Sequence, residues 1–387
     1  MAHLLRRALA DTVRDHPTIK EWLRNLENRA ESVRHSVAGH VPGLVKPRPY
    51  KVMIAVTAHC NARCEGCRYG RDFMPGSILE TDLALQAIDD AAEGGFHSIR
   101  LYGGEPLLHP DLDQMVARCV ERNLRPYVTT NGILVPKKLA PLVDAGLRDL
   151  TFGFYGADDN ADTYTGIPDY AKRFRAGLEH VRDTYGDLVD IQLNYLLKRP
   201  TCSVEDLHRA FDLALEFQAP MRVDLVHYSL PYFQEGPEAR LQFRPEDRPR
   251  IEAVVEELVR LKREHPDLLA HTIEGLRSIP DWLCLGPDMR VPCTAYEMIW
   301  IGADGTVQMC YVTFEMGNLH QTRLKDMLFQ KEHRCAARDA FTLNCPNCHC
   351  SSNERVMRHA PSRKRYAAMD AGANAPVPQP ALSAKGV

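Results

Sequence analysis

Short runs of β-branched and other apolar residues alternate with longer amphipathic segments between residue 51 and about residue 235. The short runs predict strands at 51–57, 97–103, 125–130, 148–154, 190–197 and 221–229. Between them, apolar residues recur at helical spacing, which predicts helices at 78–95, 111–123, 137–146, 170–186 and 203–218. Strands that alternate with amphipathic helices form parallel sheets. We therefore expect six βα units, fewer than the eight of a closed barrel.

The same pattern divides the chain into five parts. We expect a helical extension, an α/β core, a helical linker, a small cysteine-rich domain and a disordered tail, at 1–48, 49–236, 237–283, 284–360 and 361–387. The tail is rich in Ala and Pro and lacks apolar periodicity, which is typical of disorder. Active sites of parallel α/β sheets lie at the carboxyl ends of the strands. The loops that follow the strands should therefore carry the chemistry.

Composition narrows the class of protein. The chain of 387 residues is 44% hydrophobic and 26% charged, as is usual for soluble globular proteins. A net charge of −3 argues against a nucleic-acid partner, because such proteins usually carry a strong basic excess. Since no apolar run approaches the roughly 20 residues of a membrane span and the first residues do not resemble a signal peptide, we expect a cytoplasmic protein without a membrane partner. The oligomeric state stays open.

The 12 cysteines are the most informative residues. Disulfides explain so many thiols poorly in a reducing compartment. Cys119 and Cys202 lie in or at the start of predicted helices and are expected to be small buried apolar residues. The other cysteines fall into two groups, at 60–67 and 284–350, and such clustering indicates metal ligands.

The first group follows the first predicted strand directly. Cys60, Cys64 and Cys67 have the spacing C-x3-C-x2-C. Soft thiolate ligands select iron–sulfur clusters or zinc. Zinc needs a fourth ligand, for which His59 is the only immediate candidate. Three cysteines suit a [4Fe–4S] cluster that keeps one iron open for a reactant.

This spacing in this loop resembles the radical S-adenosylmethionine (SAM) superfamily. The resemblance implies a partial (β/α)6 barrel and a catalytic [4Fe–4S] cluster whose open iron binds SAM through its amino and carboxylate groups. It also implies reductive cleavage of SAM to a 5′-deoxyadenosyl radical that abstracts hydrogen from a substrate. The electron would come from a donor such as flavodoxin or ferredoxin.

Further residues carry the same resemblance. The second predicted strand runs into Gly103, Gly104, Glu105 and Pro106, which match the family's GGEP motif. Glycines without a Cβ let the backbone approach a ligand closely. In the family this turn meets the amino group of SAM, which Glu105 would help to neutralise, and the resemblance makes Asn131 and Asn194 further contacts to SAM.

Three positions depart from the family pattern. Gly66 stands where many members have an aromatic residue near the adenine of SAM, so this contact is in doubt. Gly153 and Tyr155 stand where relatives commonly have Ser and Asp. We transfer no role to these positions.

The second cysteine group predicts another metal centre. A hairpin over 299–310 with the turn Ala-Asp-Gly brings Cys310 back beside Cys293, and Cys345 and Cys348 add two close thiols. Four thiolates can enclose a metal or a cluster. The segment resembles the SPASM/twitch extension of radical SAM enzymes, which implies one auxiliary [4Fe–4S] cluster on these four cysteines. Cys350 is an alternative to Cys348, Cys284 and Cys335 are irregular extras, and a structural zinc site stays open.

The substrate should lie at the mouth of the barrel, under the cysteine-rich domain. Loop residues that could touch it are His227, Tyr228, Tyr232 and Glu235. The favoured reaction is oxidation, decarboxylation, dehydration or epimerisation of a polar small molecule, such as a sugar, an aminocyclitol or a nucleoside-like metabolite. The auxiliary cluster would transfer an electron or bind the substrate.

Two alternatives remain. The first is maturation of a ribosomally made peptide, although the segment 1–45 is too short and too helical for the usual leader-binding domain. The second is a zinc-binding interaction module, against which the GGEP turn and the βα array argue. Radical methyl transfer to RNA, with Cys335 as an extra catalytic cysteine, has no support in the charge balance.

Overall fold

The fold was analysed in a computed structural model. It describes residues 17–67, 69, 74–156, 159–227, 240–310 and 313–370; for 17–28 and 159 it describes the backbone alone. The predicted residues Tyr228, Tyr232 and Glu235 lie outside this part of the chain.

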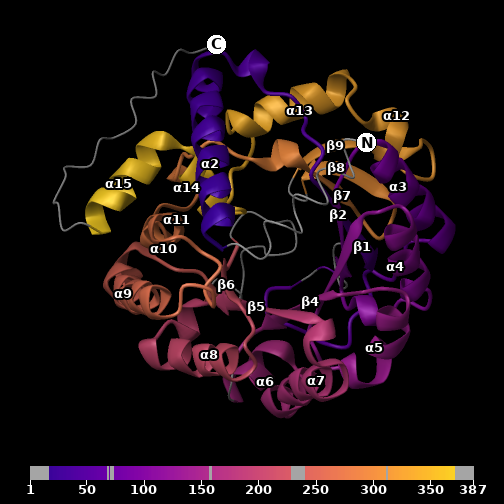
Figure 1. The fold of residues 1–387 in the computed structure, drawn as a ribbon, viewed down its shortest axis with the longest axis horizontal. Coiled ribbons are helices and arrows are strands. Elements are labelled where there is room, and N and C mark those ends of the chain that lie inside the picture. Colours follow the sequence, from indigo (N-terminus) through magenta and orange to yellow (C-terminus); the bar gives the residue numbers. More distant parts are fainter. Residues whose placement is uncertain are drawn as a thin grey trace.

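Six parallel strands form a curved sheet with helices on its outer side (Figure 1). The strands are β1 (Lys51–Thr57), β2 (Ser98–Gly103), β3 (Arg125–Thr130), β4 (Asp149–Phe154), β5 (Asp190–Leu197) and β6 (Met221–Leu225). The helices are α3 (Thr81–Glu93), α4 (Leu112–Glu121), α5 (Val135–Asp144), α6 (Asp159–Thr165), α7 (Tyr170–Tyr185) and α8 (Val204–Glu216). The predicted partial (β/α)6 barrel is confirmed.

Side-chain alternation explains why these strands lie as they do. In β2, Ile99 and Leu101 are fully buried in the apolar layer beneath the helices, whereas Arg100 and Tyr102 alternate with them and line a cavity inside the barrel. Successive side chains of a strand point to opposite faces of the sheet. Helix α8 begins at a capping residue: Ser203 accepts a hydrogen bond from the backbone N–H of Asp206 at 3.0 Å.

The cysteine-rich domain continues the barrel's own sheet. β7 (Met298–Ile301) pairs in parallel with β1, and β8 (Thr306–Cys310) and β9 (Thr313–Asn318) follow in antiparallel order. The strand order is therefore β6-β5-β4-β3-β2-β1-β7-β8-β9. The predicted hairpin is present, and its turn is closed by a hydrogen bond from the N–H of Gly302 to the carbonyl of Thr306 at 2.8 Å. Continuity of the sheet fixes this domain at the open edge of the barrel.

The remaining helices are α2 (Pro17–His40), α9 (Arg248–Glu264), α10 (Ile273–Arg277), α11 (Ile279–Leu285), α12 (Leu324–Met327), α13 (Lys331–Phe341), α14 (Ser352–Arg358) and α15 (Ala360–Asp370). Of these, α9, α10, α11, α14 and α15 lie on the left in Figure 1, α2 and α13 lie nearer the top, and α12 lies beside α3.

Helix α15 corrects one expectation. Residues 361–370 were predicted to belong to a disordered tail, but they are helical and attached to the protein. Tyr366 is 1% exposed and donates a hydrogen bond to Asp281 at 2.8 Å, and Asp370 pairs with Arg263 at 2.7 Å. One buried aromatic residue and ion pairs attach this helix to the protein. Its sequence therefore lacks the periodic apolar residues that would predict a packed helix.

Helix α2 packs on the cysteine-rich half through a buried histidine. His35 is 4% exposed, and its Nε2 lies 2.8 Å from the hydroxyl of Tyr296. Burial, helped by the nearby cations Arg358 and Arg34, lowers the pKa of His35 to about 3. The imidazole therefore stays neutral in the folded protein over a pH range in which the unfolded chain binds a proton.

We expect stability to fall as the pH drops below about 6.5, because between there and about 3 the unfolded state binds one more proton at His35 than the folded state. The slope is up to about 1.4 kcal/mol per pH unit. The difference between the unfolding free energies at pH 7 and pH 5 should be smaller for His35→Phe than for the wild type, because phenylalanine cannot take up the proton. Equal pH slopes for both proteins would contradict this origin.

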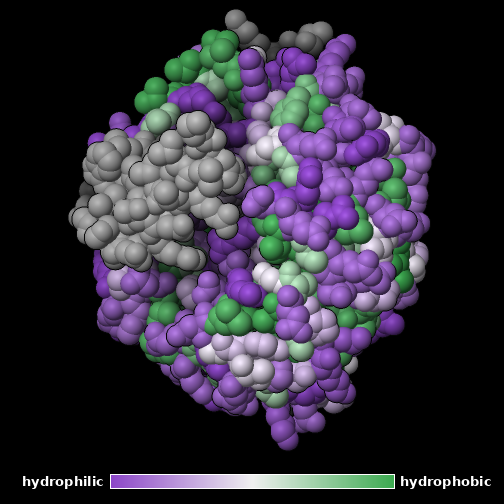
Figure 2. Space-filling model, turned by 45° about the vertical axis from the view of Figure 1, so that its right-hand side comes forward, coloured by the Kyte–Doolittle hydropathy of each residue, from purple (hydrophilic) through white to green (hydrophobic). Residues whose placement is uncertain are grey.

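The described surface is mostly hydrophilic on one face of the molecule (Figure 2). On the face shown in Figure 2, hydrophilic side chains dominate the described surface and hydrophobic ones form small groups. Within the described ranges, no helix has both the length and the apolar character needed to cross a bilayer.

Candidate cluster and cofactor sites

The loop after β1 presents its three cysteines to a cavity of about 260 Å³ inside the partial barrel. Cys60, Cys64 and Cys67 all line this cavity. Two backbone hydrogen bonds tie the loop to the end of α6, from Arg63 to Thr165 and from Glu65 to Tyr164, each at 2.7 Å. The loop therefore wraps around the cavity, as the spacing of the cysteines predicts.

The chemistry of these donors fits an iron–sulfur cluster. Burial raises the pKa of Cys60 to about 12 and that of Cys64 well above its usual value. Such thiols are neutral alone and become thiolate ligands when a bound metal compensates their charge. Among the described residues, no three His, Cys, Asp or Glu side chains are arranged to hold a single metal ion. The thiols instead border a wider space.

The two glycines of the GGEP turn are required by contact with the cysteine loop. The N–H of Gly104 donates to the carbonyl of Thr57 at 2.7 Å, and the N–H of Glu105 donates to that of His59 at 2.8 Å. A Cβ on Gly103 would lie 2.2 Å from the Thr57 oxygen, and one on Gly104 would lie 2.3 Å from the His59 oxygen. Both glycines also line the cavity. The turn thus holds the cysteine loop in place and faces the cofactor space.

Glu105 lies behind the wall of the cavity, and its expected contact to the amino group of SAM stays a prediction. Its carboxylate is fully buried and does not line the cavity among the described residues. It accepts hydrogen bonds from the Thr130 hydroxyl at 2.7 Å, from the N–H of Asn131 at 2.9 Å and from the N–H of Leu107 at 3.2 Å. Burial raises its pKa to about 7. Glu105 therefore positions the loop after β3, and Pro106 begins the short turn that follows.

Both predicted asparagines face the cavity. Asn131 donates from its amide to Asn61 in the cysteine loop at 2.7 Å and accepts from the N–H of Ile133 at 3.1 Å. Asn194 on β5 accepts a hydrogen bond from Gln192 at 2.8 Å. Their polar groups are placed where a ligand beside the cysteines would meet them.

An aromatic pair lies beside the cysteine loop, where Gly66 offers no ring. Tyr155 and Tyr164 line the cavity with ring centroids 5.2 Å apart. The buried ammonium of Lys198 lies 3.9 Å from the Tyr164 ring centroid and donates to the carbonyl of Tyr155 at 2.6 Å. Neither Tyr164 nor Lys198 belongs to a motif in the sequence. The lysine directly after the apolar strand β5 is the sequence feature that could have indicated a residue of this site.

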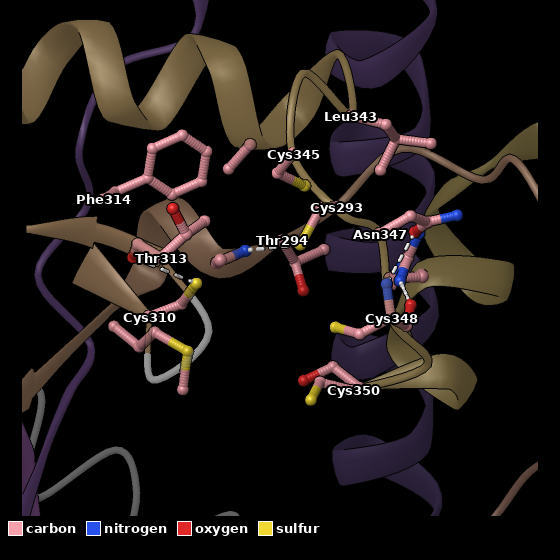
Figure 3. Close-up of a pocket in the computed structure, with 15 residues that line it drawn as sticks. Cys293, Thr294, Cys310, Thr313, Phe314, Leu343, Cys345, Asn347, Cys348 and Cys350 are labelled. Atoms are coloured by element: carbon pink, nitrogen blue, oxygen red, sulfur yellow. Dashed lines mark hydrogen bonds between the residues drawn. The ribbon is translucent and has the colours of Figure 1, made fainter. Parts of the chain in front are cut away.

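The second cavity, of about 30 Å³, is lined by five cysteines whose sulfur atoms point into the same space (Figure 3). They are Cys293, Cys310, Cys345, Cys348 and Cys350. Cys284 and Cys335, the irregular extras, are not among the described lining residues. A hydrogen bond from Cys350 lowers the pKa of Cys348 to about 6, so these two thiols act as a pair. The four predicted ligands and their predicted alternate therefore converge on one site.

His227 contacts this second site and does not line the barrel cavity among the described residues. Its ring centroid lies 4.8 Å from that of His349, and its ring nitrogens lie 3.7 Å from the sulfur of Cys350. Burial lowers its pKa to about 4. Of the four residues predicted to touch the substrate, His227 alone is described, and it joins the end of β6 to the cysteine motif.

We expect Glu105→Gln to weaken SAM binding by about tenfold, because an amide cannot accept all three of these hydrogen bonds. One buried N–H, of Asn131 or Leu107, loses its acceptor, at a cost of about 1–3 kcal/mol. The dissociation constant for SAM, measured by calorimetry, checks this. Glu121→Gln on the exposed side of α4 removes the same charge and should leave the constant unchanged. Equal constants for both variants would contradict a positioning role.

Comparison with known protein families agrees with this geometry. The radical SAM superfamily matches residues 54–198. An iron–sulfur cluster-binding domain, SPASM, matches residues 293–350. The first range contains the three cysteines, the GGEP turn and both asparagines, and the second contains all five cysteines of the second cavity.

Curated relatives match over part of their length. An AdoMet-dependent heme synthase of Methanosarcina barkeri is 31% identical over 174 residues, covering 44% of this chain and 48% of the relative. A PqqA peptide cyclase of Granulibacter bethesdensis is 26% identical over 169 residues, covering 43% and 44%. The chain spans about half the length of these relatives or less.

A solved structure shares the fold. The native anSMEcpe with bound AdoMet and Cp18Cys peptide superimposes with a TM-score of 0.61 and 14% identity, covering 84% of this chain and 97% of that one. At this identity the likeness shows the fold alone.

Proposed function

Because the chain is a radical SAM protein with a C-terminal SPASM domain, we propose that Cys60, Cys64 and Cys67 hold its catalytic [4Fe–4S] cluster and that it uses SAM to abstract hydrogen from a polar substrate. When bound, the cluster supplies the electron that cleaves SAM, and the 5′-deoxyadenosyl radical from SAM takes the hydrogen. The residues of the chain bind and orient the reactants.

One observation supports the proposal most. A single cavity is lined by the three cysteines, by Gly103 and Gly104 and by Asn131, and it extends to the polar inner wall of the barrel. Cofactor and substrate groups bound there would lie side by side. Proximity of this kind is what hydrogen transfer between two bound molecules requires.

The polar lining of the cavity supports a polar reacting group. Arg100, Asn194 and Asp224 line it together with the three cysteines. We infer that a polar small molecule enters beside SAM and is oxidised, decarboxylated, dehydrated or epimerised there. Sugars, aminocyclitols and nucleoside-like metabolites are candidates.

Peptide maturation is the second candidate. The similarity to a PqqA peptide cyclase, 26% identical over 169 residues, favours it. A single side chain of a peptide would fit the same cavity as a small molecule. Hydrogen abstraction is then the same for a peptide and for a small molecule. The two candidate substrates differ in the part that lies outside the barrel.

The second cavity supports one auxiliary [4Fe–4S] cluster. Cys293, Cys310, Cys345 and Cys348 would hold it, with Cys350 as the alternate to Cys348. Arg355 is fully buried and lines the same cavity, where its charge offsets that of thiolates. A flavodoxin or ferredoxin would supply the electron for catalysis.

The test is anaerobic reconstitution with iron and sulfide, followed by an assay for 5′-deoxyadenosine formed from SAM with dithionite. We expect about eight irons per chain, for two clusters, and 5′-deoxyadenosine from the reconstituted protein. About four irons per chain would show that the protein holds one cluster and would contradict the auxiliary cluster. Bound zinc without SAM cleavage would overturn the proposal in favour of a zinc-binding module.

A further inference from the structure

The inner face of the partial barrel is mostly polar, although parallel barrels usually fill this space with Val, Ile and Leu. Among the inner residues are Lys51, Arg100, Thr129, Asn194, Arg222 and Asp224, while Met53, Ala55 and Leu196 are apolar exceptions. Burying charged groups in a protein interior costs free energy unless they are paired or serve a ligand. This wall is therefore a candidate binding surface.

Part of the wall borders the cofactor space. Arg100, Asn194 and Asp224 line the same cavity as the three cysteines of the β1 loop. The side chain of Asp224 keeps 43% of its surface exposed, so its carboxylate is open to this cavity. A ligand held here would lie next to SAM.

The Arg100 guanidinium is held in one orientation. Its Nε donates to the hydroxyl of Thr129 at 3.0 Å, and its face lies 4.8 Å from the ring centroid of Tyr102. Tyr102 is in turn held by a hydrogen bond from the indole of Trp300 on β7. A guanidinium oriented in this way suits bidentate recognition of a carboxylate or phosphate.

The described charges of the wall favour a ligand that carries an anionic group beside a hydrogen-bond donor. Arg222 pairs with Glu354 at 3.3 Å and with Asp224 at 3.6 Å. Lys51, Arg100, Arg222 and Glu354 all act electrostatically on Asp224, so among the described groups three cations lie near two anions. A carboxylate suits the cations, and an amine or hydroxyl beside it can donate to Asp224.

We propose that this wall is the substrate site and that it receives a group carrying a carboxylate, bound by Arg100, beside an amine or hydroxyl that donates to Asp224. This inference rests on the proposed function and narrows its substrate to an amino-acid-like or hydroxy-acid-like group. The group is either a free metabolite or part of a larger molecule.

Saturation-transfer NMR on the anaerobically reconstituted full chain tests the site, with SAM in excess so that its own amino-acid group is already bound. The probes are L-alanine, propionate, L-alaninamide and methyl phosphate. We expect transfer to alanine and propionate and loss of transfer to alaninamide, which lacks the carboxylate. Asp224→Asn should reduce transfer to alanine to the level of propionate.

Arg100→Gln should abolish the difference between alanine and alaninamide, and Arg100→Lys, which keeps the charge, should retain part of it. Arg125→Gln is the matched control, because Arg125 starts the neighbouring strand and pairs with Asp149 away from the cavity. Equal transfer to alanine and alaninamide, or preference for methyl phosphate, would overturn the inference. The same wild-type samples are assayed for 5′-deoxyadenosine, so that failed SAM cleavage is distinguished from failed carboxylate binding.

Discussion

Cys64→Ala is expected to abolish 5′-deoxyadenosine formation while the protein stays folded. In the proposed function, three thiolates hold the catalytic cluster. A loop with only two of these thiolates cannot hold the cluster and leave one iron open for SAM. The alanine side chain fits the loop, whose contacts to α6 run through the backbone of Arg63 and Glu65. Iron content and 5′-deoxyadenosine yield, measured on anaerobically reconstituted samples, check this.

Cys119→Ala is the matched control. Cys119 is fully buried in α4 and belongs to the apolar layer, so this variant loses packing but no ligand. It should keep the iron content and the SAM cleavage of the wild type. The Cys64 variant should keep the iron of the second cavity alone. SAM cleavage that survives Cys64→Ala would show that another set of residues holds the cluster.

Gly104→Ala is expected to have the second largest effect. Its Cβ would lie 2.3 Å from the carbonyl oxygen of His59 and 2.7 Å from that of Ala58, both backbone atoms that cannot move without displacing the cysteine loop. Overpacking of this kind costs about 1–3 kcal/mol. If this cost falls on the geometry of the cysteine loop, SAM cleavage should drop by roughly 5- to 140-fold, since each 1.4 kcal/mol is a factor of ten in an equilibrium.

Gly39→Ala separates this contact from a general effect of adding a methyl group. A Cβ at Gly39 meets nothing within 4 Å, and alanine stabilises a helix by up to about 1 kcal/mol relative to glycine. Unfolding free energy and 5′-deoxyadenosine yield should stay at or above those of the wild type. Equal behaviour of the two variants would contradict the role assigned to the GGEP turn.

The sequence predicts the barrel well because its strands and helices carry strong periodic signals. The run of β1, the helix-like spacing in α3 and the cysteine loop are all local features, and the structure agrees with them. The pairing of β7 with β1 is not local, since Lys51 meets Met298 across more than half of the chain. Neither segment alone contains a sequence pattern that predicts this contact.

The sequence predicts that three cysteines share one site, but not which residues line the wall beside them. Cys60, Cys64 and Cys67 form a recognisable spacing, whereas Arg100 and Asp224 come from different strands and line the same cavity only because the sheet curves. The sequence shows the alternation of polar and apolar residues in β2 and β6. It does not show which face of the sheet lies inside the barrel. His227 lies two residues after the end of β6 and contacts Cys350, and its expected contact to the substrate stays a prediction.

The most direct test of the account is whether an iron held by Cys60, Cys64 and Cys67 binds SAM. Electron-nuclear double resonance on the reduced protein, with SAM labelled by ¹⁵N in its amino group and by ¹⁷O in its carboxylate, measures this contact. The account predicts hyperfine coupling from both labels in the wild type and in Cys119→Ala, and none in Cys64→Ala. A wild-type protein that holds its full complement of iron and shows no coupling from either label would contradict it.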